Sequence, residues 1–324
     1  MKLIDSDVTI IPYEDPYKLV ETVGRTCYKS ESNITDESSK KFVENLIRNK
    51  HFAMLEHARI TFKIKQDTSD NHCSYNHMLN YCKLCAEFQQ VPKAYVYDGS
   101  DYIILSVTMS HLYNPKWEHF TCSRMLEFLR QIFTYRDTIS GYSSCEILLG
   151  AISIEILNND DINDVTCGPC WREMKTLTAR FICDRGVSHE LVRHRVALAQ
   201  ESQRYCNYGL EKFGKEITCI KPSRYDEWSV GMKQAFEYAL TTAEHAYFNL
   251  INLGLKPQEA RGVLPNETKT EVVFTATYTE WDHFFAVRAF GVTGAPHPDM
   301  HALATKLLSS LQEDNLSDYE FRKE

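Results

Sequence analysis

The chain has 324 residues, of which 43% are hydrophobic and 25% are charged, and its formal net charge is −8 at pH 7. This acidic balance argues against general affinity for nucleic acid, so any site for a polyanion must be local. No stretch approaches the roughly 18 consecutive apolar residues that a membrane-spanning helix needs, and the first ten residues lack the pattern of a secretory signal. The eleven cysteines are therefore expected to be reduced thiols of a cytoplasmic protein that binds neither nucleic acid nor membrane.

The N-terminal segment predicts one strand and two helices. The stretch VTIIPY is strand-like, and in DPYKLVETVGRTCY, which follows it, Asp15 is suited to cap a helix whose first residue is Pro16. In the next stretch, TDESSKKFVENLIRNKH, Thr35 or Asp36 is expected to cap a second helix. The apolar stripe of this second helix consists of Phe42, Leu46 and Ile47.

Two segments alternate apolar and polar residues as a strand with one buried face does. In HARITFKIKQ the apolar positions are Ile60, Phe62 and Ile64. In TLTARFICD they are Leu177, Ala179, Phe181 and Cys183. The second strand leads into RGVSHELVRHR, where Gly186 is expected to turn the chain and Ser188 to cap a short helix.

The segment between these two strands has a different character. AYVYDGSDYIILSVTM predicts a hairpin around Asp98 and Gly99, PKWEHFTCSRMLEFLRQIF predicts a helix, and LNNDDINDVT predicts an exposed loop. We interpret residues 67–172, approximately, as a large insertion in a single domain that spans residues 1–324.

The C-terminal third is predicted to be helical. GMKQAFEYALTTAEHAYFNLINLG forms a long helix that ends at Gly254, a further helix begins at Pro257, and PDMHALATKLLSSLQ forms the last one. The predicted fold class is therefore α+β.

Cations gather in the stretch LVRHRVALAQESQRY, which contains Arg193, His194, Arg195 and Arg204. Such groups repel one another unless an anion lies between them, and the planar guanidinium suits a phosphate or an anionic ring edge. Ser202 and Arg204 point the same way if this segment is extended. The alternative is that these cations complement a helix C-terminus, which stabilises a helix by about 0.3–1 kcal/mol for each charge.

Three other regions are candidates for chemistry. RNKHFAMLEHARITF places His51 at a junction of helix and strand, where a solvated histidine is the alternative. Arg261 and Arg288 stand among apolar and aromatic residues, where the alternative is two arginines that reach out of a helical bundle. CKLC and CGPC have the spacing of a zinc site or a redox pair, although chance pairs are expected among eleven cysteines. Their thiols belong to Cys82, Cys85, Cys167 and Cys170.

Four blocks, in this order, resemble the flavin-dependent thymidylate synthases. They are GRTCYKS, HFAMLEHARITF, RGVSHELVRHR with QESQRYCNY, and ARGVLPNETKTEVVFTATYTEWDHFFAVR. The resemblance implies a curved mixed or antiparallel sheet flanked by helices, assembled as a homotetramer with active sites shared between subunits. It also implies that dUMP is methylated to dTMP, with methylenetetrahydrofolate as carbon donor and FAD, reduced by NADPH, as hydride carrier.

The resemblance also assigns residues to two groups. The FAD-binding residues are implied to be His51, Arg193, His194, Arg195, Gln200 and His283. The dUMP-binding residues are implied to be Glu190, Glu201, Ser202, Arg204, Arg261 and Arg288. Arg288, at the uracil edge, is the implied catalytic residue because it can stabilise negative charge as uracil is activated, and no metal is implied. Positive groups at the flavin stabilise the reduced anion that donates hydride.

The sequence departs from the family pattern in one binding segment. Six residues, 196–201, separate the Arg-His-Arg triplet from Ser202, where the family usually has seven. One missing residue shifts an extended chain by about 3.3 Å. This departure keeps open a non-catalytic relative that binds nucleotide and flavin, and the thiol pairs keep open a zinc-stabilised interaction module. Ser202 as a nucleophile is a further alternative, but no base stands beside it, so we favour a binding role.

Overall fold

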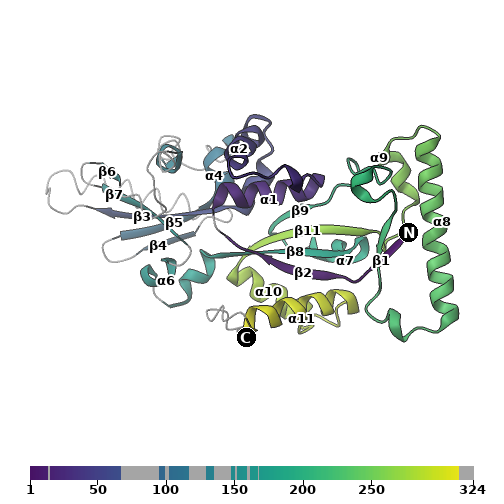
Figure 1. Cartoon of the computed structure of the whole chain (residues 1–324). Coiled ribbons are helices and arrows are strands. Elements are labelled where there is room, and N and C mark those ends of the chain that lie inside the picture. The colour runs from purple at the N-terminus through teal and green to yellow at the C-terminus, as the bar shows by residue number, and fades with distance from the viewer. Residues whose placement is uncertain are drawn as a thin grey trace.

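The computed structural model describes residues 1–13, 15–66, 95–98, 102–116, 129–134, 147–149, 152–158, 161–166 and 168–313 (Figure 1). The strands are β1 (Lys2–Ile4), β2 (Asp7–Ile11), β3 (Arg59–Gln66), β4 (Tyr95–Asp98), β5 (Tyr102–Thr108), β6 (Ile147–Leu149), β7 (Ile152–Leu157), β8 (Thr176–Asp184), β9 (Ala197–Gln200), β10 (Thr218–Ile220) and β11 (Lys269–Thr277). The α-helices are α1 (Pro16–Tyr28), α2 (Ser38–Arg48), α4 (Met109–Tyr113), α6 (Ile162–Val165), α7 (Arg185–Leu191), α8 (Val230–Asn252), α9 (Pro257–Ala260), α10 (Tyr278–Arg288) and α11 (Pro298–Glu313). The 3-10 helices are η1 (Glu31–Asn33), η2 (Phe52–His57), η5 (Gly168–Glu173), η6 (Glu211–Phe213), η7 (Tyr225–Glu227) and η8 (Arg261–Val263). Helices and antiparallel sheets together confirm the α+β class.

Four antiparallel strands, in the order β2-β8-β11-β9, form the sheet that carries the candidate site. β8 and β11 pair over nine residues, from Lys269 opposite Asp184 to Thr277 opposite Thr176. The strand β11 corrects the prediction that the C-terminal third is helical. Its sequence, KTEVVFTAT, is rich in β-branched residues, but both of its faces are buried, so the alternation of apolar and polar residues is missing.

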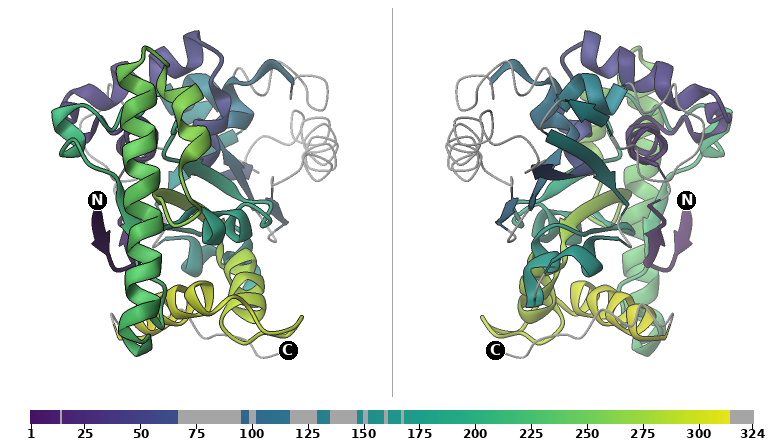
Figure 2. Two further views of the ribbon diagram at one scale, coloured as in Figure 1. Left: turned by 90° about the vertical axis from the view of Figure 1, so that its right-hand side faces the viewer. Right: turned by 90° about the vertical axis from the view of Figure 1, so that its left-hand side faces the viewer.

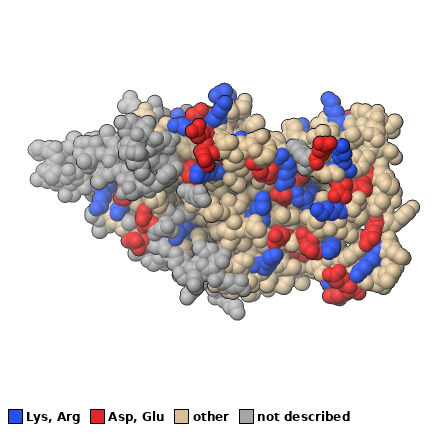
Figure 3. Space-filling model, viewed as in Figure 1, with Lys and Arg blue, Asp and Glu red and all other residues tan. Residues whose placement is uncertain are grey.

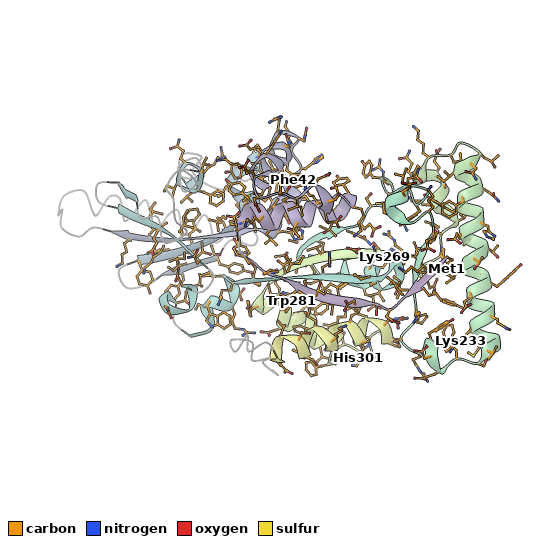
Figure 4. The ribbon with its side chains drawn as sticks, viewed as in Figure 1. Met1, Phe42, Lys233, Lys269, Trp281 and His301 are labelled. Atoms are coloured by element: carbon orange, nitrogen blue, oxygen red, sulfur yellow. The ribbon has the colours of Figure 1, made fainter. Side chains whose placement is uncertain are left out.

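The two faces of this sheet are covered by different helices. Phe274 of β11 packs with residues of α7, α10 and α11 on one face of the sheet. Val273, the residue that precedes it, packs with α1 on the other face. Trp281 of α10, labelled in Figure 4, is fully buried in the first layer and donates from Nε1 to the carbonyl oxygen of Leu177 at 3.1 Å. The predicted inner face of β8 is confirmed, because its four apolar residues belong to the same layer.

The strand β3 lies in a second antiparallel sheet, of order β4-β5-β3-β7-β6. Its predicted buried side is confirmed, and so is the hairpin, in which Asp98 pairs with Ile103. Both neighbours of β3, the strands β5 and β7, come from residues 67–172, so the two strands that flank this range lie in different sheets. Residues 129–133 of the predicted helix are helical, and Ile162, in the predicted loop, is instead a buried residue of α6. That residues 67–172 are an insertion stays a prediction.

Helix α1 joins the two sheets, and α8 closes the other end of the molecule. Tyr17 and Val20 of α1 pack in the core of the second sheet, while Leu19 and Val23 pack against the first. Figure 2 (left) shows α8 standing beside β1, which pairs in parallel with β10. As predicted, α8 ends just before Gly254, whose φ of +100° is a conformation that glycine adopts without strain.

One of the three predicted helix caps is confirmed. Asp15 accepts from the backbone nitrogens of Tyr17 and Lys18 at 2.8 and 3.1 Å, with Pro16 at the first helical position. The other two predictions are wrong. The second helix begins at Ser38, after Glu37, instead of after Thr35 or Asp36. The cap of α7 is Asp184, which accepts from the nitrogen of Val187 at 2.8 Å, whereas Ser188 lies inside the helix and donates to the carbonyl oxygen of Arg185.

Two helical glycines offer a matched test of this packing. A Cβ atom on Gly24 of α1 would lie 2.7 Å from two ring carbons of Phe42 on α2, whereas a Cβ on Gly231 of α8 meets nothing within 4 Å. We expect Gly24→Ala to lower the free energy of unfolding by about 1 kcal/mol, because the ring must move. Gly231→Ala should raise it by about 0.5–1 kcal/mol, because alanine favours a helix. Urea unfolding measures both changes, and shifts of the same sign would contradict the packing described.

Candidate active site

Two helices that start at opposite ends of the β8–β11 ladder meet over its middle. α7 follows β8 after Asp184, and α10 follows β11 after Thr277, which is at the other end of the ladder. The seven residues of α7 rise about 10 Å and the eleven of α10 about 16 Å, while nine paired residues span roughly 27–30 Å. Because both helices lie on the same face and run toward each other, their C-terminal ends come together.

Arg288, the last residue of α10, binds the end of α7 and the turn that follows it through all three of its guanidinium nitrogens. Nε donates to Nε2 of His194 at 3.2 Å, and Nη2 donates to the carbonyl oxygen of Glu190 at 3.2 Å. Nη1 forms an ion pair with the Glu190 carboxylate. Two helix C-termini concentrate negative potential at this point, so a guanidinium is favoured there. The structure thus brings together three residues that the sequence analysis singled out.

The imidazole of His194 is held among aromatic rings. Its centroid lies 5.2 Å from that of Phe284, 5.9 Å from that of Phe274 and 5.9 Å from that of His283. Burial first, and then the charges of Arg288 and His283, lower the pKa of His194 to about 4. The ring is therefore neutral near pH 7. Because its Nε2 accepts from Arg288, the proton of the neutral ring is assigned to Nδ1.

The remaining residues assigned to flavin binding are mostly exposed. Arg193 and Arg195, on either side of His194, form no hydrogen bond or ion pair through their side chains with any residue that the structure describes. His283 is exposed beside His194. His51 precedes η2, and Arg261 of the nucleotide group is the first residue of η8. Both are exposed, and within the described part of the chain neither forms a side-chain hydrogen bond with Glu190, His194 or Arg288.

Gln200 ties the edge strand β9 to the start of α7. Its amide nitrogen donates to the hydroxyl of Ser188 at 2.9 Å and to that of Thr270 at 3.3 Å. After Gln200 the chain is not extended but turns, since the nitrogens of residues 205 and 206 donate to the carbonyl oxygen of Ser202. Ser202 and Arg204 are therefore not paired on one side of a strand, and the exposed guanidinium of Arg204 lies 5.5 Å over the ring of Tyr205.

A chain of alternating charges, which the sequence analysis did not find, surrounds Glu201. Lys269 binds Glu201 at 2.9 Å and Glu271 at 2.5 Å, and Glu271 also binds Lys29. Glu201 and Glu271 are only 2% and 6% exposed. Burial opposes a charge on either partner, but the attraction outweighs it, raising the pKa of Lys269 and lowering that of Glu271. Once β11 is recognised as a strand, Lys269 and Glu271 are expected side by side, because residues two apart in a strand lie on the same face.

Three of these charged residues, Lys29, Glu201 and Lys269, line a pocket of about 470 Å³, together with Glu31, Tyr208 and Phe213. Figure 4 labels Lys269 at the start of β11. Because Lys269 and Glu271 alternate with Val272 and Phe274, the pocket lies on the α1 face of the sheet, whereas Arg288 lies on the α7 face. The residues assigned to the nucleotide are therefore divided between the two faces. Figure 3 shows basic and acidic side chains interspersed over one side of the molecule.

The part of the chain that the structure describes contains neither a metal-ligand cluster nor a membrane-spanning helix. No group of three or more potential metal-ligating residues occurs in it, and none of its helices is long and apolar enough to cross a bilayer. Of the two predicted thiol pairs, only Cys170 lies within it, as a free and partly buried thiol. Cys82, Cys85 and Cys167 lie outside the described residues, so the zinc hypothesis stays a prediction.

A family model described as thymidylate synthase complementing protein matches residues 9–133 and 171–314. The match includes Glu190, the Arg-His-Arg triplet, Glu201 and Arg288. It also includes residues 67–133, which the sequence analysis assigned to the insertion, so an insertion of that size is not confirmed.

Several relatives are named flavin-dependent thymidylate synthase. That of Geobacter sulfurreducens is 35% identical over 105 residues, which are 32% of this chain and 43% of the relative. That of Corynebacterium glutamicum is 31% identical over 146 residues, which are 40% of this chain and 54% of the relative. The chain thus spans about half the length of these relatives. A solved structure described as a UMP/dUMP methylase, PolB from Streptomyces cacaoi bound with 5-Br dUMP, aligns with a TM-score of 0.40 and 13% identity over 97% of this chain and 93% of that one.

The buried charges and an exposed ion pair allow a matched test. We expect Lys269→Met to lower the free energy of unfolding by about 3 kcal/mol, because it leaves the buried Glu201 carboxylate without its cation. Lys306→Met removes the partner of Asp7 at 2.7 Å, but both side chains are exposed, so a loss below about 0.5 kcal/mol is expected. Thermal unfolding at pH 7 compares them, and equal losses would show that the charge chain around Glu201 is solvated.

Proposed function

Because the chain belongs to the family of thymidylate synthase complementing proteins, we propose that it is a methyltransferase that converts dUMP to dTMP. In this proposal methylenetetrahydrofolate donates the carbon, and FAD, reduced by NADPH, carries the hydride. The observation that carries the proposal is the meeting of α7 and α10, where Glu190, His194 and Arg288 from two separate blocks of the family pattern are joined by hydrogen bonds. The single domain over residues 1–324 and the cytoplasmic location stay predictions.

The exposed cations of the triplet suit an anionic cofactor. Arg193 and Arg195 are exposed and have no side-chain ion pair among the described residues, so both guanidinium groups are available to a diphosphate or to a reduced flavin ring. We assign FAD binding to them, together with His51, His194, Gln200 and His283. When bound, reduced FAD supplies the hydride that completes the new methyl group.

The nucleotide is assigned to the second set of residues. In the proposed mechanism Arg288 donates to the uracil edge and stabilises the negative charge that develops when the ring is activated. Ser202, Arg204 and Arg261 bind the phosphate and sugar, and Glu201 contributes to the same site. Ser202 serves as a binding residue in this scheme, because the base that a serine nucleophile needs is not hydrogen-bonded to its hydroxyl within the described residues.

The division of these residues between the two faces supports a shared site. Arg288 and Glu190 lie on the α7 face, while Glu201 lies on the α1 face, so one small nucleotide cannot contact both sets across a packed sheet. Two copies of the chain can bring one set from each subunit together. We therefore propose the homotetramer that the family resemblance implies, with dUMP bound between subunits.

An assay of the flavin-loaded protein tests the proposed reaction. NADPH should bleach the flavin absorbance, and reoxidation without oxygen should require dUMP and methylenetetrahydrofolate together, with dTMP detected by chromatography. Protein that stays colourless after incubation with FAD would refute the proposal. Binding of dUMP without turnover would instead favour the non-catalytic relative, for which the six-residue segment before Ser202 is the specific argument.

Arginine variants test the assignment of the cofactor. We expect Arg193→Ala and Arg195→Ala each to weaken FAD binding by about 10–100-fold, because an anionic group loses its charged partner. Arg224→Ala is the control, since its guanidinium pairs with Glu227 of η7 in an exposed ion pair. Fluorescence titration with FAD measures the three affinities. If both triplet variants bind FAD as tightly as the control, the assignment is wrong.

Complementation tests the shared site. Arg288→Ala and Glu201→Ala subunits should each have a strongly lowered but measurable activity alone. Mixed oligomers made by co-expression should recover activity, because some sites then combine an intact α7 face with an intact α1 face. Arg288→Ala mixed with Glu190→Ala is the control and should recover nothing, since both changes damage the same face. Mixed oligomers no more active than their parents would contradict the sharing of sites.

A further inference from the structure

The guanidinium of Arg288 carries five N–H groups, of which Glu190 and His194 use three. The Nε–H donates to His194, one N–H of Nη1 donates to the Glu190 carboxylate, and one N–H of Nη2 donates to the Glu190 carbonyl oxygen. Among the described residues, the second N–H on each terminal nitrogen has no acceptor. Arg288 is therefore fixed at three points while two donors remain available to a ligand.

This arrangement orders the side chain before a ligand arrives. An arginine side chain has many rotamers, and fixing it at the moment of binding opposes association. Here the side chain is only 13% exposed and that of Glu190 26% exposed, so both are restrained by the protein. A preorganised donor stabilises developing charge better than one that must move into place during the reaction.

His194 accepts from Arg288 only while its ring is neutral. The ring is packed between Phe274 and Phe284, and the charged or titratable groups that face it are Arg288 and His283 of α10, with Glu190 of α7 on the far side of Arg288. A protonated ring would lose the acceptor and repel the guanidinium. The lowered pKa of His194 keeps the acceptor available near pH 7.

We propose that Glu190 and His194 are positioning residues that fix the guanidinium of Arg288, so that its two unused N–H groups bind the carbonyl edge of a pyrimidine nucleotide. The inference rests on the proposed function and adds to it. Glu190 acts on the reaction through Arg288, by its carboxylate and its backbone carbonyl, rather than as an independent ligand of the substrate. Its contribution to the rate should therefore vanish when Arg288 is absent.

A double-mutant cycle tests this coupling. Glu190→Ala, Arg288→Ala and the double variant are compared with wild-type protein, using calorimetric binding of dUMP and the anaerobic rate of dUMP-dependent flavin reoxidation. We expect Glu190→Ala to lower the rate by about 10–100-fold, with a smaller effect on dUMP affinity. In the Arg288→Ala background the same change should have no further effect on either quantity.

Conservative variants separate position from charge and allow for loss of folding. Glu190→Gln keeps an oxygen that can accept from Nη1 and should retain activity within about threefold, whereas Glu190→Asp keeps the charge but withdraws the carboxylate and should lose more. Glu227→Ala, on an exposed ion pair, is the control for loss of a carboxylate. Circular dichroism and the melting temperature verify that each variant is folded, and the Gln and Asp variants decide the matter if Glu190→Ala does not fold.

The outcomes distinguish this inference from the proposed function. Wild-type protein that binds no dUMP would refute the proposed function, and this inference with it. This inference alone would be overturned if the wild-type protein is active and Glu190→Ala reacts at the same rate. It would also be overturned if Glu190→Ala lowers the rate by the same factor with and without Arg288. If Glu190→Asp retained activity and Glu190→Gln lost it, this inference would also be overturned, because Glu190 would then contribute by its charge rather than by positioning Arg288.

Discussion

The antiparallel pairing of β8 with β11 is the constraint on which the candidate site depends. It fixes the start of α7 at one end of a nine-residue ladder and the start of α10 at the other. The lengths of the two helices then decide that their C-termini meet instead of passing or falling short. Arg288 and Glu190, 98 positions apart in the sequence, form an ion pair because of this match of lengths.

The charges of this acidic protein are organised by the same sheet. On the α7 face, two helix ends attract one guanidinium and leave the neighbouring arginines of the triplet exposed. On the α1 face, buried carboxylates are each paired with a lysine, since an unpaired buried charge is far more costly than a paired one. The C-terminal end of α7 is thus complemented by Arg288 of α10, and not by the exposed arginines of the triplet, for which that role was the alternative; two N–H groups of Arg288 remain for a ligand.

Local signals in the sequence are sufficient to predict an element where one capping or turn residue, or the alternation of apolar and polar residues, governs it. The Asp15–Pro16 start of α1, the alternating strands β3 and β8 and the hairpin at Asp98 were all predicted correctly. The start of α2 and the cap of α7 were not, because several neighbouring side chains can cap and packing selects among them. The strand β11 was missed because burial on both faces removes the alternation.

The sequence by itself determined the class of the fold, the family blocks and the residue types of the candidate site, since these depend on composition, order and short-range periodicity. Only the tertiary structure decided which of those residues meet. It joined Glu190, His194 and Arg288, placed Glu201 in a charged pocket on the opposite face and turned the chain after Gln200. The physical reason is that strand pairing and the alternation of side chains across a sheet connect residues by register, which no spacing within one segment of the sequence encodes.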